Sequence, residues 1–123
     1  MSPKELTPAE HSLIGEKMKT DFADMKKLAD ELLALCESKN KAYGEAWSED
    51  GGQGAYFQGI ARKWARIRTQ AKSRGFNLFD VSPLEDPTES LDETLGDLVN
   101  YCLLTMVRRR AILAHIQGME SKS

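Results

Sequence analysis

The stretch that decides the fold is residues 90–107, SLDETLGDLVNYCLLTMV. Its apolar residues recur every three or four positions, which is the spacing of the buried face of a helix. Ser90, followed three residues later by Glu93, forms the capping-box pattern that begins a helix. The helix is expected to continue through Ile116 to Gly118. Because its apolar stripe is wide, the helix must bury that stripe against other helices or against a second subunit.

Further helices are expected upstream. Residues 7–10, TPAE, are typical of a helix start, with a capping threonine and a proline at the first helical position. Either Gly15 or the pair Thr20-Asp21 divides a short first helix from a long one that ends at Gly44. Another helix is expected over residues 55–73, whose apolar positions also follow the helical spacing.

The remaining segments are rich in turn-forming residues. Residues 48–54, SEDGGQG, are expected to form a loop, residues 77–87 a linker with two prolines, and residues 119–123 a frayed tail. No run shows the period of two that a half-buried strand requires. The sequence therefore predicts one all-α domain, residues 1–123, folded as a compact bundle of three to four helices.

Composition limits the functional classes. Lys and Arg number 17 and Asp and Glu number 19, which gives a net charge of −2 and argues against strong binding to duplex DNA. Two cysteines, Cys36 and Cys102, lie in apolar helical runs and are expected to be reduced. The sequence shows neither a signal-peptide pattern nor an apolar stretch of about 18–20 residues. A cytoplasmic protein with no membrane association is therefore expected.

The first cluster of candidate binding residues lies where a helix gives way to a loop, in residues 39–47, KNKAYGEAW. Aromatic rings such as those of Tyr43 and Trp47 stack on nucleobases. Lys39 and Asn40 supply a positive charge and an amide for a charged, flat ligand. The alternative is purely structural, because lysines favour the C-termini of helices and a tryptophan at this point can cover the core.

A second cluster is basic and belongs to the helix expected over residues 55–73. Lys63 and Arg66 are three residues apart and Arg62 and Arg66 are four apart, so each pair shares a helix face. Like charges on one face repel each other unless an anion is bound there, which indicates a phosphate-binding face. A solvated helix surface is the alternative.

A third cluster, Glu93, Asp97 and Asn100, follows one stripe of the last helix. Two carboxylates and an amide on one face suit Mg²⁺, which binds one or two carboxylates together with water and phosphate oxygens. Glu93 has a structural alternative, because it also closes a capping box. Asp97 is surrounded by apolar residues and needs a partner, either a metal cation or a basic side chain such as Lys63 or Arg66.

In this order, the three clusters resemble the nucleotide modification associated domain family of the first type, which occurs in phages and bacteria. Its members share K-N-x-x-Y-G-x-x-W, then K-x-x-R, then D/E-x-x-x-D-L-x-N-Y, and the resemblance covers roughly residues 30–110. The matching residues here are Lys39, Asn40, Tyr43, Gly44, Trp47, Lys63, Arg66, Glu93, Asp97, Leu98, Asn100 and Tyr101. The resemblance implies a role in nucleotide metabolism or modification, with Tyr101 among the nucleotide-binding residues.

More distantly, the step Leu95-Gly96-Asp97 is similar to a motif of the all-α NTP pyrophosphatases, the MazG-like and dCTPase-like enzymes. Those enzymes are oligomeric helical bundles that hold Mg²⁺ over a nucleoside triphosphate with an E-x-x-E pair on one helix and E-x-x-D on a later one. This sequence departs from them, because Thr94 stands where the second motif has an acid and the first helix has no E-x-x-E pair. The resemblance implies a MazG-like bundle and a homo-oligomer.

The expected function is nucleotide binding in phage or bacterial nucleotide metabolism. If the protein is an enzyme, the expected reaction is Mg²⁺-dependent phosphoanhydride hydrolysis, with Glu93 and Asp97 as the metal-binding and catalytic residues. Lys63 and Arg66 would neutralise phosphate charge, and Asn100 would orient a carboxylate or contact the sugar. Two alternatives remain open: a protein that sequesters a nucleotide without turnover, and a helical scaffold subunit of a modification complex.

Overall fold

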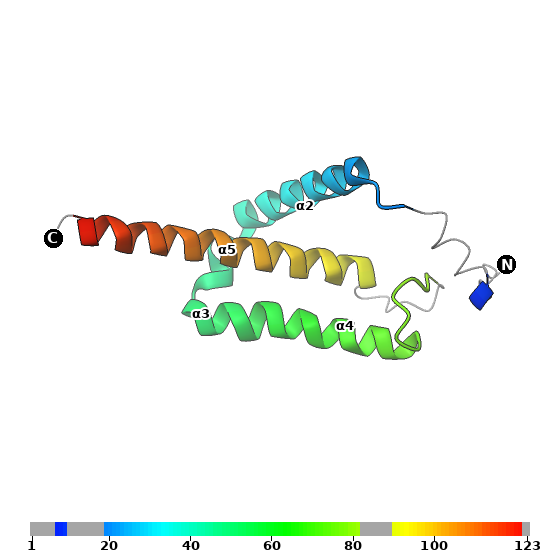
Figure 1. Cartoon of the computed structure of the whole chain (residues 1–123). Coiled ribbons are helices and arrows are strands. Elements are labelled where there is room, and N and C mark those ends of the chain that lie inside the picture. Colours follow the sequence, from blue (N-terminus) through cyan, green and yellow to red (C-terminus); the bar gives the residue numbers. More distant parts are fainter. Residues whose placement is uncertain (1–6, 10–18, 82–89, 122–123) are drawn as a thin grey trace.

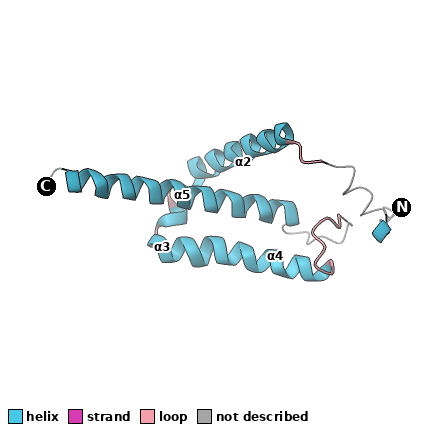
Figure 2. Ribbon diagram, viewed as in Figure 1, coloured by secondary structure: helices cyan, strands magenta, loops and turns pink. Residues whose placement is uncertain are grey.

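The computed structural model describes residues 7–9, 19–81 and 90–121. Within these residues the chain is helical and contains no strand (Figure 2), which confirms the predicted all-α fold. The elements in chain order are α2 (Phe22–Tyr43), the 3₁₀-helix η1 (Ala46–Ser48), α3 (Gly51–Gly54), the π-helix η2 (Ala55–Ala61), α4 (Arg62–Ser73) and α5 (Leu91–Ser121).

Helix α5 is the centre of the bundle. Helices α2 and α4 pack on either side of it, and η2 also contacts it (Figure 1). The C-terminal part of α5 extends past the ends of the other helices (Figure 1). A residue in the middle of α5 can therefore contact side chains from both neighbouring helices.

The helix ends follow the local signals in the sequence. Asp21 caps α2, because its Oδ1 accepts hydrogen bonds from the backbone N–H groups of Ala23 at 2.9 Å and Asp24 at 3.2 Å. Gly44 ends α2 with a φ of 63°, a left-handed conformation that glycine adopts without steric cost. At the start of α5, the Ser90 hydroxyl oxygen accepts from the backbone N–H of Glu93 at 3.1 Å.

Two expectations about segments differ from the structure. Residues 48–54 are not all loop, because Gly51–Gly54 form a helical turn that leads directly into η2. Asp50 supports this turn, since its backbone oxygen accepts from the N–H of Gly54 and its Oδ2 accepts from Gln58 Nε2 at 2.9 Å. At the other end of the chain, α5 continues through Gly118 to Ser121, into the segment expected to fray.

Other expectations fall only partly on the described residues. The break at Thr20-Asp21 is confirmed, because α2 begins directly after it. The alternative break at Gly15 and most of the expected first helix lie outside the described residues, as does the second half of the linker over residues 77–87. The described half of that linker, residues 77–81, is not helical.

Two glycines let the helices approach α5 closely. A β-carbon added to Gly96 would lie 2.8 Å from the Leu32 Cδ2 atom of α2, and one added to Gly59 would lie 2.9 Å from the Tyr101 ring of α5. The α2 contact is also held by Asn100, whose side-chain amide donates to the backbone oxygen of Leu32 at 3.1 Å. Asn100 is buried, so this hydrogen bond fixes how α2 sits on α5.

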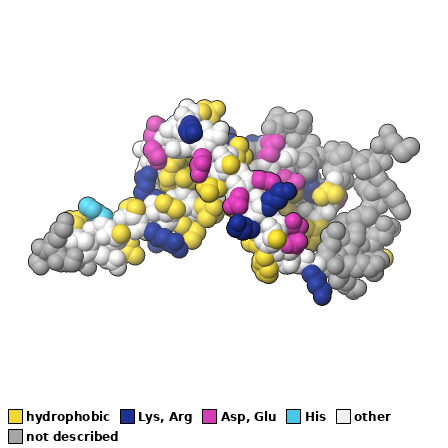
Figure 3. Space-filling model, turned by 90° about the horizontal axis from the view of Figure 1, so that it is seen from above, with side chains coloured by type: hydrophobic (Ala, Val, Ile, Leu, Met, Phe, Trp, Pro, Cys, Tyr) yellow, Lys and Arg dark blue, Asp and Glu magenta, His cyan; other side chains and the backbone are white. Residues whose placement is uncertain are grey.

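Few apolar side chains are buried in the isolated chain. Among the described residues, the buried hydrophobic ones are Ala55, Ile67 and Leu91. Many large apolar side chains are exposed instead, including several on α2 and on the projecting end of α5 (Figure 3). No helix in the described part of the chain has the length and apolar character needed to cross a bilayer.

Candidate functional site

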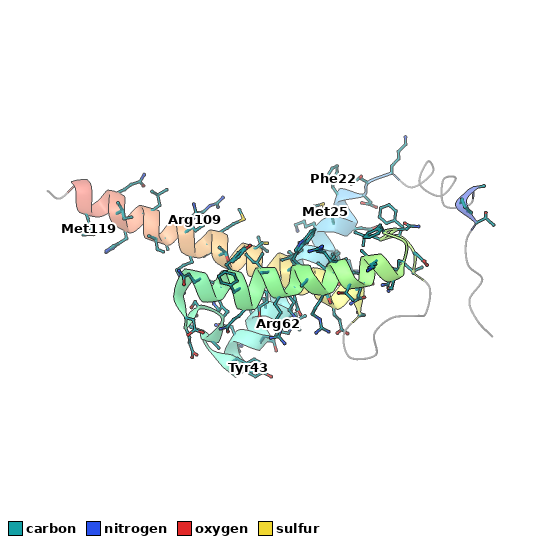
Figure 4. The ribbon with its side chains drawn as sticks, turned by 90° about the horizontal axis from the view of Figure 1, so that it is seen from below. Phe22, Met25, Tyr43, Arg62, Arg109 and Met119 are labelled. Atoms are coloured by element: carbon teal, nitrogen blue, oxygen red, sulfur yellow. The ribbon has the colours of Figure 1, made fainter. Side chains whose placement is uncertain are left out.

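A cavity of about 590 Å³ opens where the C-terminal end of α2 and η1 meet η2, the start of α4 and the middle of α5. It brings together residues that are far apart in the sequence. Eight of the predicted binding residues line it: Lys39, Asn40, Tyr43, Trp47, Lys63, Asp97, Asn100 and Tyr101. Arg62 lines it too, and Figure 4 shows Arg62 of α4 and Tyr43 at the end of α2 on the same side of the molecule.

The electrostatic centre of the cavity is the Asp97 cluster, which comprises Lys39, Lys63 and Asp97. Lys63 Nζ lies 2.9 Å from Asp97 Oδ2, and Lys39 Nζ lies 3.0 Å from Asp97 Oδ1. Each carboxylate oxygen therefore accepts a charge-assisted hydrogen bond from a different helix. The side chains of Lys63 and Asp97 are each 15% exposed, whereas that of Lys39 is 50% exposed.

These contacts keep Asp97 ionised. Partial burial by itself would raise the pKa of the Asp97 carboxyl. The hydrogen bonds and positive charges of Lys63 and Lys39 outweigh burial, so the pKa lies below its ordinary value. The sequence left two partners open for Asp97, a metal cation or a basic side chain such as Lys63 or Arg66. The structure shows Lys63 as a partner, together with Lys39, which the sequence did not suggest.

The aromatic wall of the cavity comprises Tyr43, Trp47 and Tyr101. Its Trp47 ring is held by a second group of polar contacts, the Trp47 clasp, which comprises Glu45, Trp47 and Arg108. Trp47 Nε1 donates to Glu45 Oε2 at 3.1 Å, and the Arg108 guanidinium donates to the same oxygen at 3.3 Å. The guanidinium carbon also lies 5.2 Å from the centre of the Trp47 ring, within the range of a cation–π contact. Because Arg108 belongs to α5, the clasp holds the loop after α2 against the central helix.

Two predicted site residues lie outside the cavity. Glu93 is an exposed residue in the first turn of α5, one helical turn from Asp97 towards the N-terminus, and it does not line the cavity. Arg66 is half-buried on α4 and lines a separate hollow with Ala65, Thr69 and Gln70. The structure therefore brings Asp97 and Lys63 together in one cavity but leaves Glu93 and Arg66 outside it.

Three other cavity residues with polar or ionisable side chains are not among the predicted site residues. Cys36 lies one helical turn before Asn40, Gln58 lies in η2, and Arg62 belongs to the basic cluster without a predicted role in the site. The spacing of Cys36 and Asn40 on α2 could have indicated Cys36, since residues four apart share a helix face. Both cysteines are free thiols, as expected.

The described residues hold no group of three or more His, Cys, Asp or Glu side chains placed to bind a metal ion. No family model, curated protein or solved structure matches this chain. The family resemblance of the three motifs therefore stays a prediction, and the site is interpreted from its own chemistry.

Proposed function

We propose that this protein binds a nucleotide in the cavity, with the phosphate at the cationic side chains and the base at the aromatic ones. One observation carries the proposal: a single cavity has cationic and aromatic side chains from well-separated parts of the chain. The cations are Lys39, Arg62 and Lys63, and the aromatic residues are Tyr43, Trp47 and Tyr101. A volume of about 590 Å³ lies in the range of small-molecule sites.

Binding without turnover is the form of this function that the Asp97 cluster favours. Both oxygens of the Asp97 carboxylate already accept hydrogen bonds from ammonium groups. A magnesium ion placed there would have to displace those groups or sit beside them against their charge. Mg²⁺-dependent hydrolysis is the second candidate, because Asp97 does line the same cavity as Lys63, one of the two residues predicted to neutralise phosphate charge.

A binding experiment with matched variants tests the proposal. Lys39→Gln removes a cation of the cavity, whereas Lys41→Gln removes one from the same end of α2 that does not line the cavity. Binding of a nucleotide panel is measured by equilibrium dialysis, and products are identified by mass spectrometry with and without Mg²⁺. We expect Lys39→Gln to weaken binding and Lys41→Gln to leave it unchanged. Equal effects of the two substitutions, or no binding at all, would contradict the proposal.

We further propose that the working unit is at least a homodimer. The projecting end of α5 carries exposed apolar side chains that no other part of the described chain covers: Ile112, Leu113, Ile116 and Met119. Exposed apolar surface of this extent on one helix is typical of a protein–protein contact. A second copy of the chain presents the same apolar surface on its own α5. Packing of the two α5 helices against each other about a two-fold axis would therefore bury the exposed apolar side chains of both copies.

A further inference from the structure

We infer that Arg62 is the principal phosphate-binding residue of the cavity and that it binds the phosphate at the cavity mouth. The inference rests on the proposed function and deepens it, because it assigns the phosphate to one of three cations and to one place. It follows from the contacts that each cation makes within the chain, from the position of Arg62 and from the chemistry of the guanidinium group.

The first observation is that both lysines of the cavity are already engaged by the fold. Lys63 Nζ lies 2.9 Å and Lys39 Nζ 3.0 Å from the two oxygens of Asp97. Lys63 has a further interaction beyond this ion pair. A phosphate can therefore bind either ammonium group only in competition with a contact that holds α2 or α4 to α5.

The second observation is that Arg62 makes no such contact. Its side chain is exposed, and it takes part in none of the hydrogen bonds or ion pairs among the described residues. Asp97, the one carboxylate of the described lining, accepts from the two lysines instead. Glu45 is held in the Trp47 clasp, and Asp50 in the turn before η2. An anionic group can therefore bind Arg62 without breaking a contact of the fold.

The third observation concerns the place and the geometry of this group. Arg62 and Tyr43 both line the cavity and are both exposed, and they lie on the same side of the molecule (Figure 4), so they mark its mouth. A guanidinium group is planar and can donate two parallel hydrogen bonds to two oxygens of one phosphate, whereas an ammonium group acts as a point charge. We therefore place the phosphate at the mouth on Arg62 and the base against the aromatic wall.

Isothermal titration calorimetry of the full chain tests this inference with matched ligands and variants. The nucleosides of the common bases and their 5′-monophosphates and triphosphates are titrated in EDTA. Arg62→Gln is compared with Arg68→Gln, since both arginines are exposed residues of α4 but only Arg62 lines the cavity. For the nucleotide that the wild type binds most tightly, Arg62→Gln should raise the Kd at least tenfold and Arg68→Gln less than twofold.

The nucleoside distinguishes a contact with phosphate from any other role of Arg62. Arg62→Gln should change the Kd of the matching nucleoside by less than twofold, because that ligand lacks the phosphate. Arg62→Lys should recover only part of the nucleotide affinity, because it keeps the charge but loses the paired donors. If the nucleoside binds too weakly to titrate, the comparison with Arg68→Gln decides.

Urea unfolding shows whether a loss of binding comes from a loss of structure. Arg62→Gln should leave the urea midpoint unchanged, whereas Lys63→Gln, which breaks the ion pair with Asp97, should lower it. Three results would each overturn the inference and leave nucleotide binding standing: equal nucleotide affinities of Arg62→Gln and Arg68→Gln, an equal loss of nucleoside and nucleotide affinity in Arg62→Gln, or a fall in its midpoint like that of Lys63→Gln. A panel in which no ligand binds would overturn both proposals.

Discussion

Replacing Asp97 by asparagine tests how the cavity is held together. The substitution keeps the side-chain shape and one oxygen acceptor but removes the charge that pairs Lys39 with Lys63. Hydrogen bonds to charged groups contribute about 1.5–3 kcal/mol when shielded from water. The contact with Lys63 falls in this class, because both side chains are only 15% exposed. The contact with the half-exposed Lys39 adds about 0–1 kcal/mol.

Because asparagine retains an acceptor, we expect Asp97→Asn to lower the free energy of unfolding by about 2 kcal/mol at pH 7. At roughly 4 °C per kcal/mol for a chain of this size, the melting temperature should fall by about 8 °C. Urea unfolding followed by circular dichroism at fixed protein concentration measures the first quantity, and a thermal scan measures the second. Asp30→Asn is the control, since Asp30 pairs with Lys26 at 3.8 Å on an exposed face, and it should change stability by less than about 0.5 kcal/mol.

The pH dependence of the same variant gives an independent check. The pKa of Asp97 is lower in the folded chain than its ordinary value, so its stabilising contribution is fully present above about pH 5. That contribution is lost as the pH falls below the ordinary Asp pKa of about 3.9 and through the lower folded pKa. The stability gap between wild type and Asp97→Asn should therefore narrow in acid.

Magnesium separates the two partners that the sequence allowed for Asp97. With lysines as the partners, Mg²⁺ should not raise the melting temperature of the wild type, and Asp97→Asn should lose stability equally with and without the ion. A wild type that Mg²⁺ stabilises and a variant that it does not would refute this reasoning. So would a variant as stable as the wild type at pH 7.

Three further predictions concern assembly, the aromatic wall and close packing. Light scattering at micromolar concentration should give at least a dimer mass, and a monomer mass would contradict the assembly proposed for α5. Trp47→Ala should weaken nucleotide binding by about 1–3 kcal/mol in calorimetry while the helical circular dichroism stays unchanged; unchanged affinity would mean that Trp47 does not contact the ligand. Gly59→Ala should destabilise the fold by about 1–3 kcal/mol, because its methyl group would press on the Tyr101 ring. Gly118→Ala, where the added carbon meets nothing within 4 Å, should show no such loss in urea unfolding.

Local features of the fold could be predicted because short-range chemistry determines them. A cap at Asp21 or Ser90 needs only the two or three residues that follow it, and Gly44 ends a helix through its own backbone freedom. The helical turn at Gly51–Gly54 was missed, because three glycines within seven residues favour a loop and its support comes from the Asp50 side chain. Propensity at that point was overridden by a specific contact.

The sequence indicated most of the residues that line the cavity but not how they are arranged around it. Spacing correctly placed Lys63 and Arg66 on neighbouring parts of one helix, but three residues also add about 4.5 Å along the axis, and Arg66 lies beyond the cavity. Glu93 is about 6 Å from Asp97 along α5 in the same way. That Lys39 and Lys63 meet at one carboxylate depends on how two helices pack on a third, which no spacing within a helix reveals.

The π-helix η2 makes this arrangement respond differently to the loss and to the gain of one residue. A π-helical segment corresponds to one residue inserted into an α-helix and taken up by a wider turn. Deleting one residue between Ala55 and Ala61 would let the segment relax to α-helical geometry with little rotation of α4, so Lys63 would still meet Asp97. Inserting one more residue would turn α4 relative to η1 by about 100°, the angle per residue of an α-helix, and Lys63 would then point away from Asp97 although no cavity side chain had been replaced. A library of single-residue deletions and insertions is therefore expected to show this segment tolerating the loss of a residue but not the gain of one.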